Sequence, residues 1–270
     1  MNEAIISLAK LPLSSRLLKQ AHRKLITGVR GEHKLPGEFR TSQNWIGGSG
    51  PTDAIFVPPS HVYVDELIGD LENFLHNDKI DVPSLIRIGI AHYQFETIHP
   101  FLDGNGRIGR LLITLFLVDR NILHQPLLYL SAYFEKDKGH YYDNLTRVRE
   151  KGEMIHWLKY FLIGVEKTAE VAVNTLSEIV KMKQNMESNI HEKWGRRTRS
   201  ALQLLKQLFI HPVITVKQAQ QICNLSKKAA GELIDSFEKA GIIVEQTGQS
   251  RNRIFIFMSY LNLFETTSGV

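Results

Sequence analysis

The sequence contains a single cysteine, Cys223, among 270 residues. One thiol excludes an intramolecular disulfide, and it also excludes zinc sites built from several cysteines. No segment approaches the roughly 18 consecutive apolar residues of a transmembrane helix. The N-terminus also lacks the basic start and the continuous apolar core of a secretory signal. We therefore expect a cytoplasmic protein that has no contact with a membrane.

An excess of either charge is missing from the first 190 residues, which contain 22 basic and 22 acidic side chains. Residues 191–270 contain 11 Lys and Arg against 6 Asp and Glu, so the whole net charge of +5 lies there. This asymmetry predicts two modules, of which the second faces an anionic partner. We place the first module at 1–188, a linker at 189–195 and the second module at 196–270.

Helical periodicity prevails in the first module, for example from Val62 to Leu75, where the apolar residues share one face. A segment rich in glycine and proline interrupts this pattern between residues 31 and 59, and it is far longer than an ordinary connection. Its apolar residues argue against a disordered linker. We expect an ordered functional loop with short extended pieces, which form a small β-hairpin at about 42–59.

The second module follows a different pattern, which begins with an amphipathic helix from Thr198 to Phe209. Thr215 is predicted to cap a second helix, and Ser226 a third helix that runs to Lys239. Two alternating stretches, IIVEQ and RIFIF, then predict short strands. Three helices followed by two strands are typical of a winged helix-turn-helix. The expected fold class is therefore mainly α, with a small α+β module at the C-terminal end.

One stretch of twelve residues, His99 to Arg110, reads HPFLDGNGRIGR and lies where one helix is expected to end and another to begin. Its glycines let a ligand approach the backbone, and the free N–H groups and the dipole of a helix N-terminus favour anions. Arg107 and Arg110 are three residues apart, so both guanidinium groups can reach the same ligand. These features predict a phosphate-binding site.

Asp103 would repel a phosphate unless a divalent cation bridged the two. Mg²⁺ fits, because it is commonly held by one carboxylate together with phosphate oxygens and water. His99 can take a proton from an incoming hydroxyl as a general base. Each group alone has an ordinary interpretation as a surface histidine, a turn or a solvated arginine pair. Their coincidence within twelve residues favours phosphoryl or nucleotidyl transfer.

The stretch matches, at every defined position, the signature HxFx(D/E)GNGRxxR of Fic-domain (Fido) proteins. The segments AHRKLITGVRG, PGEFRTSQNWIGG, AHYQFETIHPF and LLYLSAYFEKDKGHYYDNL also resemble consecutive Fic blocks, and the resemblance covers roughly residues 10–185. The appended winged helix resembles a common bacterial arrangement. The resemblance implies a helical Fic domain with a β-hairpin flap. It further implies a protein adenylyltransferase that transfers AMP from ATP to a Ser, Thr or Tyr hydroxyl of a target protein or of itself.

The resemblance also implies a role for each residue of the motif. His99 would deprotonate the target hydroxyl, and Asp103 would hold Mg²⁺. The phosphates of ATP would be bound by the glycine turn and the two arginines, namely Gly104, Asn105, Gly106, Arg107 and Arg110.

Outside the motif, Tyr141 resembles the tyrosine that lines the pocket of the nucleotide base. Ile55, Phe56 and Val57 resemble the part of the flap that pairs with the backbone of the target and so aims its hydroxyl at the α-phosphorus. An ordinary core aromatic and an ordinary β-hairpin are equally open interpretations of these residues.

One departure from the family concerns autoinhibition. Many Fic proteins have an upstream helix with (S/T)xxxE(G/N), whose Glu pairs with the last arginine of the motif. The 270 residues contain no match, and at the nearest site, Glu72-Asn73, Ile68 occupies the Ser/Thr position. We expect either a truncated form or one restrained in trans by a separate inhibitory helix or antitoxin. Arg110 is then expected to be unpaired and the site constitutively competent.

The second module has basic residues at the start of its third helix and on the wing, where a DNA backbone would meet them. These residues are Lys227, Lys228, Arg251 and Arg253. Acidic residues on the same helix favour protein docking or a homodimer equally well. An alternative function is therefore a DNA-binding regulator whose Fic-like pocket senses a nucleotide, although a sensor has no need of His99. A third alternative is a Fic enzyme that uses another donor or removes AMP.

Overall fold

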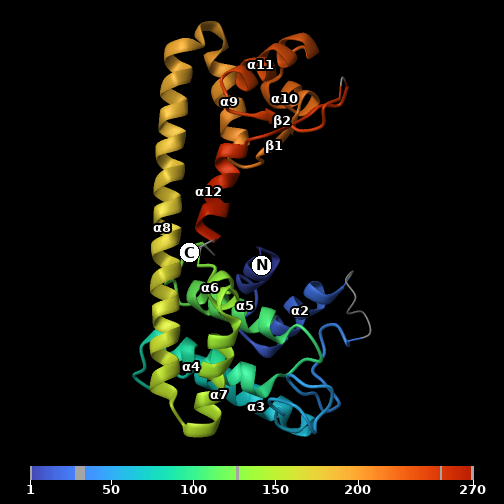
Figure 1. Ribbon diagram of the computed structural model, residues 1–270, viewed down its shortest axis with the longest axis vertical. Helices are drawn as coiled ribbons and strands as arrows, with labels where there is room; N and C mark the ends of the chain where they lie inside the picture. Colours follow the sequence, from blue (N-terminus) through green and yellow to red (C-terminus); the bar gives the residue numbers. More distant parts are fainter. Residues whose placement is uncertain (1, 28–33, 126–127, 250, 269–270) are drawn as a thin grey trace. The chain divides into compact units, whose positions relative to one another are not determined.

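The computed structural model describes residues 2–27, 34–125, 128–249 and 251–268 (Figure 1). Residues 31–33, at the start of the expected long loop, and Ser250, between the last two expected strands, lie outside the described residues. The chain forms two compact units, Met1–Ala169 and Glu170–Val270. In the described ranges, no helix combines the length and the apolar character that crossing a bilayer requires.

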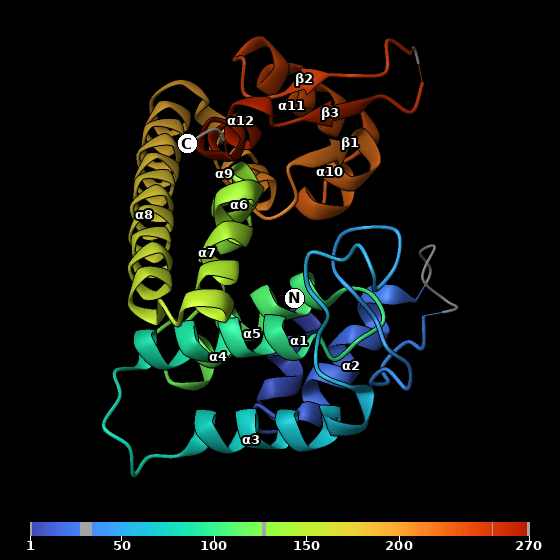
Figure 2. The ribbon, with the colours of Figure 1, turned by 60° about the horizontal axis from the view of Figure 1, so that its bottom comes forward.

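The first unit is mainly helical, as the sequence predicts. Figure 2 shows α4 and α5 beside each other, and α3 packs against the other side of α4. Its elements are α1 (Asn2–Leu8), α2 (Ser15–Ile26), a 3-10 turn (His61–Tyr63), α3 (Val64–His76), α4 (Ser84–Ile98), α5 (Asn105–Asp119), α6 (Leu130–Lys136), α7 (Lys138–Lys151) and the start of α8 (Met154–Lys193).

α4 and α5 form the centre of this unit because apolar residues occupy most of their faces. Ile88, Phe95 and Ile98 of α4 are fully buried, as are Leu112 and Leu115 of α5. A helix that is apolar all round belongs inside a core rather than on its surface. Smaller apolar contacts from the surrounding helices complete the core and fix both helices in place.

α4 and α5 approach each other most closely at Gly109. A Cβ atom at this position would lie 2.4 Å from Glu96 Oε1 and 3.1 Å from the ring of Phe95. The ring of His92 donates its Nδ1 hydrogen to the carbonyl of Gly109 across 3.0 Å. This contact brings the C-terminal end of α4 close to the N-terminal end of α5, where the twelve-residue motif lies.

The expected β-hairpin at 42–59 is present as a single antiparallel bridge between Ile46 and Phe56. The N–H of Ile46 donates to the carbonyl of Phe56 across 2.9 Å, and the N–H of Phe56 donates back across 3.1 Å. The residues between them form a turn, in which the carboxylate of Asp53 accepts from the N–H groups of Ser49 and Gly50. The ladder does not continue because this turn takes up the intervening backbone.

The second unit combines helices with a small antiparallel sheet in the order β1-β3-β2. Its elements are the end of α8, a 3-10 turn (Gly195–Arg197), α9 (Thr198–Leu208), β1 (Val213–Thr215), α10 (Val216–Cys223), α11 (Lys227–Lys239), β2 (Val244–Glu245), β3 (Ile254–Ile256) and α12 (Met258–Ser268). The predicted caps are confirmed, since Thr215 and Ser226 accept from the N–H groups of Gln218 and Ala229. Strand β1 and helix α12 were not expected. The winged-helix assignment stays a prediction.

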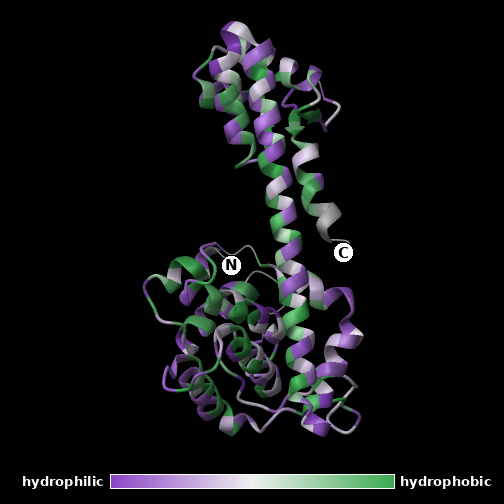
Figure 3. Ribbon diagram, turned by 90° about the vertical axis from the view of Figure 1, so that its left-hand side faces the viewer, coloured by the Kyte–Doolittle hydropathy of each residue, from purple (hydrophilic) through white to green (hydrophobic). Residues whose placement is uncertain are grey.

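The structure divides the chain inside α8 rather than at the expected linker of 189–195. α8 continues to Lys193, and Ile190 is fully buried in the core of the second unit. Met182, Met186 and Ile190 follow each other at intervals of four residues, so one face of the helix is apolar here. In Figure 3, hydrophilic and apolar residues accordingly alternate along this helix.

Candidate active site

His99 is the residue that ends α4, and its backbone has the left-handed conformation, with φ 50° and ψ 59°. This conformation is uncommon for a residue other than glycine and persists only where the surroundings enforce it. The N–H of His99 donates to the carbonyl of Phe95 across 2.9 Å. Its own carbonyl accepts from Arg40 Nε at 3.0 Å and from Asn44 Nδ2 at 3.3 Å. These contacts fix the backbone of His99 and therefore the position from which its imidazole extends.

Arg40 holds the end of α4 and the base of the flap together. The residue is only 2% exposed, and its guanidinium donates to four backbone carbonyls, those of Ile98, His99, Ser42 and Pro59. Its backbone N–H also donates to the carbonyl of Pro100 across 2.8 Å. A buried charge is tolerated when hydrogen bonds satisfy it in this way. Arg40 is therefore a positioning residue for both segments.

The loop of the motif is closed from the inside by Asn105. Its Nδ2 donates to the carbonyl of Phe101 across 2.7 Å, and its Oδ1 accepts from the N–H of the same residue at 2.8 Å. The side chain is thus buried and used within the loop. Only the backbone of Asn105, not its amide side chain, is available to bind a phosphate.

His22 of α2 supports the loop from the other side. Its ring stacks on Phe101 at a centroid distance of 3.9 Å. Nδ1 accepts from the N–H of Gly37 at 2.8 Å, so Nε2 carries the hydrogen and donates to the carbonyl of Asp103 across 3.0 Å. Burial lowers the pKa of His22, which is consistent with this neutral form.

The N-terminus of α5 offers free backbone donors. Gly104 has φ 80°, a conformation that favours glycine, and its carbonyl accepts the first hydrogen bond of the helix, from Ile108 at 3.1 Å. No described residue accepts from the N–H groups of Asn105, Gly106 and Arg107. Three free donors at a positive helix end form a site for an anion.

Asp103 precedes this turn and is exposed. Its Oδ1 accepts from the N–H of Gly104 at 2.6 Å, which leaves Oδ2 available. Within the described ranges, no three His, Cys, Asp or Glu side chains gather into a metal site. The residues present therefore fit a cation that takes one protein carboxylate and draws its other ligands from phosphate and water, as Mg²⁺ does.

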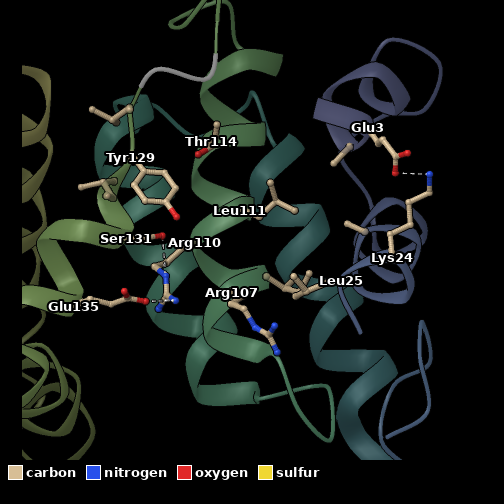
Figure 4. A pocket seen from close by; sticks show the side chains of 15 residues that line it. Glu3, Lys24, Leu25, Arg107, Arg110, Leu111, Thr114, Tyr129, Ser131 and Glu135 are labelled. Carbon is tan, nitrogen blue, oxygen red and sulfur yellow. Dashed lines mark hydrogen bonds and ion pairs between the residues drawn. The ribbon is translucent and has the colours of Figure 1, made fainter. Parts of the chain in front are cut away.

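The two arginines of the motif differ in their surroundings, as Figure 4 shows. Arg107 is exposed and forms no hydrogen bond or ion pair with a described residue. Arg110 is bound to α6, because Nε donates to Ser131 Oγ and Nη2 to Glu135 Oε1, both at 3.0 Å. The expectation that Arg110 is unpaired is wrong. Its partner, Glu135, lies after the motif in the sequence and is followed by Lys136 rather than by Gly or Asn. The pattern (S/T)xxxE(G/N) therefore did not identify it.

A cavity of about 300 Å³ joins the groups predicted to act together. It is lined by His99, Leu102, Asp103, Gly104, Asn105, Gly106, Arg107, Arg110, Phe134, Glu135, Lys138, Tyr141 and Tyr142. A second cavity of about 800 Å³, shown in Figure 4, lies along α5 towards α1 and α2 and shares Arg107, Arg110 and Glu135 with the first. The structure thus places every residue of the predicted nucleotide site, including Tyr141, around one space.

Tyr141 is almost fully buried, and its hydroxyl is engaged. His92 uses Nδ1 as a donor to Gly109, so its Nε2 accepts from the hydroxyl of Tyr141 across 2.9 Å. Burial lowers the pKa of His92 to about 4, which keeps this ring neutral at pH 7. Tyr142 also lines the cavity and is about half exposed. It offers a ring face to a ligand more freely than Tyr141 does.

Burial sets the protonation of the groups around His99. It lowers the pKa of His99 to about 4, the charges of Arg149 and Arg40 act in the same direction, and the backbone of Glu96 and the carboxylate of Asp103 oppose them. The imidazole is therefore neutral at pH 7. Nδ1 is buried, and the ring lines the cavity.

The three predicted flap residues differ in side-chain exposure and in the use of their backbone groups. Ile55 and Val57 are exposed, whereas Phe56 turns inward, with its ring centroid 3.7 Å from Cζ of Arg149. Both backbone groups of Phe56 are used in the bridge to Ile46. The N–H of Ile55 also donates to the carbonyl of Ile46, across 2.9 Å. The carbonyl of Ile55 and the backbone of Val57 therefore remain for the predicted pairing with a target.

The basic residues of the second unit also fall into two groups. Lys227, Lys228 and Arg251 are exposed and form no ion pair with a described residue. Arg253 is bound to Asp235 of α11 at 3.3 Å and is less available to a phosphate backbone.

Several residues of the site were missed by sequence reasoning. They are His22, Arg40, Asn44, Glu135, Tyr142 and Arg149. Each lies outside the motif and reaches it only through the fold. The one local signal was their place in the segments AHRKLITGVRG, PGEFRTSQNWIGG and LLYLSAYFEKDKGHYYDNL, or just beyond them.

Comparisons with known proteins agree with this geometry. The sequence profile of the Fic/DOC family matches residues 12–117. A probable protein adenylyltransferase of Aquifex aeolicus is 39% identical over 110 residues, which cover 39% of this chain and 32% of that protein. A protein adenylyltransferase of Caenorhabditis elegans is 30% identical over 174 residues, which cover 64% of this chain and 30% of that protein.

The fold is also similar to that of a Fic family protein from Desulfovibrio desulfuricans G20. The TM-score is 0.55 at 20% sequence identity, and the match covers 94% of this chain and 72% of that one. The chain spans only about a third of the length of the curated relatives named above. The residues that match the Fic/DOC profile contain the whole motif and end inside α5, so the match lies within the first unit.

Proposed function

We propose that this chain is a protein adenylyltransferase, which transfers AMP from ATP to a Ser, Thr or Tyr hydroxyl of a target protein or of itself. The observation that carries this proposal is the cavity that His99, the free N–H groups of α5 and the motif arginines line together. The names of the curated relatives support the same activity.

His99 serves as the general base. The ring is neutral at pH 7 and its Nδ1 is buried, so Nε2 is the nitrogen left to accept the proton of a hydroxyl that enters the cavity. As that proton leaves, the hydroxyl oxygen forms a bond to the α-phosphorus. The bond from the α-phosphorus to the oxygen that bridges to the β-phosphate breaks, and pyrophosphate departs.

The helix end and the arginines bind the charged part of the nucleotide. The free N–H groups of Asn105 and Gly106 suit phosphate oxygens, and Arg107 and Arg110 add positive charge in the first and second turns of α5. Asp103 would hold Mg²⁺, which supplies charge neutralisation for the phosphates when it is bound. The donors are fixed before the reaction, so they stabilise the developing charge without having to reorganise.

The flap aims the target. Ile55 and Val57 are exposed beside the bridge. The N–H of Ile55 donates to Ile46, so an extended segment of the target would pair with the carbonyl of Ile55 and with the backbone of Val57. Such pairing fixes the target along the flap and places one side chain over His99. It depends on backbone more than on side chains, so it tolerates targets of different sequence.

The test uses three proteins, the wild type, His99→Ala and Arg110→Ala, with Mg²⁺ and ATP labelled at the α or the γ phosphate. We expect covalent label from the α position only, a loss of about 10²–10⁴-fold in His99→Ala, and weakened ATP binding in Arg110→Ala. Transfer from the γ position would instead identify a phosphotransferase. If ATP binds but no label is transferred to any protein, the chain senses a nucleotide and the proposal fails.

A further inference from the structure

Several buried polar atoms near the end of α4 and on its neighbouring segments have no hydrogen-bond partner in the described part of the chain. Among the described residues, such side-chain atoms occur in Asn44, Glu96, Thr97, His99, Asn144 and Arg149. All of them lie in the first unit, on the flap, at the end of α4 or on α7. A buried group that forms no hydrogen bond costs about 1–3 kcal/mol, so a cluster of them in one place calls for an explanation other than stability.

Arg149 stands out in this cluster because it is a cation. Its Nε and Nη2 are buried, and it forms neither a hydrogen bond nor an ion pair with a described residue. It contacts the flap, where the ring centroid of Phe56 lies 3.7 Å from Cζ. A guanidinium over an aromatic face is held by a cation–π interaction.

The charge of Arg149 is not neutralised by its surroundings. Glu96 is the carboxyl group that faces it, and burial raises the pKa of Glu96 to about 7, with Arg110 and Arg149 opposing the shift. Glu96 is therefore only partly ionised at pH 7. An arginine without a full counter-ion is a poor stabiliser, since an apolar residue of similar volume often serves stability as well or better.

We propose that Arg149 is a positioning residue that couples the flap to the base, with one face of its guanidinium on Phe56 and its charge directed towards His99. This role rests on the proposed transfer reaction. Phe56 is the bridged residue of the flap, so holding its ring fixes the exposed Ile55 and Val57 on either side of it. Placing the target segment in this way matters because small errors in the attack geometry cost much of the rate.

The same residue acts on the protonation of His99. The charged groups that face His99 are Arg149 from α7, Arg40 from the segment before the flap and Asp103 from the motif loop. Arg149 and Arg40 oppose a second proton on the ring, and Asp103 favours it. The guanidinium of Arg40 already donates hydrogen bonds to four backbone carbonyls. Arg149 is thus the cation that connects the position of the flap with a base that is ready to accept a proton.

The test compares Arg149→Met with Arg149→Lys and with the control Arg147→Met. Arg147 lies on the same helix but pairs with Glu153 at 2.8 Å. Three quantities are measured on the full chain. They are the pKa of His99 by NMR, with His99→Ala to assign the signal, the hydrogen exchange of the Ile46 and Phe56 amides, and the dissociation constant of ATP with Mg²⁺.

In Arg149→Met we expect the pKa of His99 to rise by on the order of one unit. We expect hydrogen exchange at the Ile46 and Phe56 amides to accelerate about two- to sixfold, which corresponds to the free energy of one cation–π contact. ATP affinity should not change. Arg149→Lys keeps the charge but loses the planar stack, so it should accelerate exchange while leaving the pKa of His99 near the wild-type value. Arg147→Met should change none of the three.

The acid limb of the pH profile of self-modification should move to higher pH in Arg149→Met, because His99 then gains its second proton at higher pH. If neither the pKa of His99 nor the flap amides respond in Arg149→Met and Arg149→Lys, Arg149 has no positioning role and the inference is wrong. These two measurements do not depend on catalysis. A wild type that transfers no AMP therefore overturns the proposed function without deciding this question.

Discussion

In the second unit, Thr215 and Gln218 cap α10 by exchanging hydrogen bonds, and the described part of that unit contains no buried side-chain polar atom without a partner. In the first unit, Glu96, His99 and Arg149 are buried close to one another with polar atoms that have none. The second unit follows the rule that buried polar groups are satisfied. Among the described residues, the first unit breaks that rule on the flap, at the end of α4 and on α7, the segments that include the candidate base.

The largest expected effect concerns Arg40, the satisfied buried cation of the first unit. Arg40→Met removes the donors of four carbonyls, so it should lower the free energy of unfolding by about 3 kcal/mol or more. Arg149→Met removes a cation without hydrogen bonds and should cost far less. Urea unfolding of both variants measures the difference. Equal losses would remove the distinction between satisfied and unsatisfied charges.

Glu96 should give a pH-dependent effect. Burial raises its pKa from 4.5 to about 7, so the stability that its proton contributes is fully present below pH 4.5 and is lost as the pH rises through 7. Glu96→Gln removes this loss. The free energy of unfolding of the variant relative to the wild type should therefore grow by about 3 kcal/mol between pH 4 and 8.

The buried rings of His92 and His99 have pKa values lowered to about 4 and contribute with the opposite sign, since their stability is lost as the pH falls. They are present in both proteins, so they cancel in the difference. Urea unfolding at pH 4, 6 and 8 gives that difference directly. A difference that stays constant with pH would show that Glu96 titrates normally in the folded protein.

A smaller effect is expected at the ion pair of Arg110. The carboxylate of Glu135 competes with a nucleotide phosphate for the same guanidinium. Glu135 is about half exposed, and exposed pairs contribute only about 0.2–1 kcal/mol. Glu135→Gln should therefore tighten ATP binding about two- to fivefold by calorimetry. Unchanged or weaker binding would mean that the carboxylate does not compete.

The smallest expected effect tests the surface of the second unit. Lys227 and Lys228 are exposed and unpaired among the described residues, and we expect retention of the full chain on duplex DNA at low salt. Replacing both by alanine should reduce the salt slope by about 2. Lys206→Ala, on α9, is the control. A wild type that does not bind DNA would favour protein docking through this unit.

The sequence was most informative where the site is continuous in the chain. His99, Asp103, Gly104 and Arg107 lie within nine residues, and the glycines and the helix start could be predicted from local rules. The caps of α10 and α11 were predictable for the same reason. Each of these features depends on residues within one or two helical turns.

The remaining features depend on contacts between distant segments. Arg40 reaches His99 across 59 positions, and His22 reaches Asp103 across 81. No local pattern indicates where such a side chain ends. The partner of Arg110 and the inward turn of Phe56 are likewise consequences of packing. Sequence reasoning therefore found the residues that line the candidate site but not the residues that hold them in place.

Gly109 has a consequence for the whole site. α4 carries the base and α5 carries the anion donors, and the two helices touch where a methyl group would collide with Glu96. The lack of a Cβ atom at Gly109 thus sets the distance between the imidazole on α4 and the anion donors on α5. Any larger residue at this position would have to push the two helices apart, and a shift on the order of 1 Å can cost about a hundredfold in rate. The spacing of the candidate site therefore depends on a glycine that takes no part in the proposed chemistry.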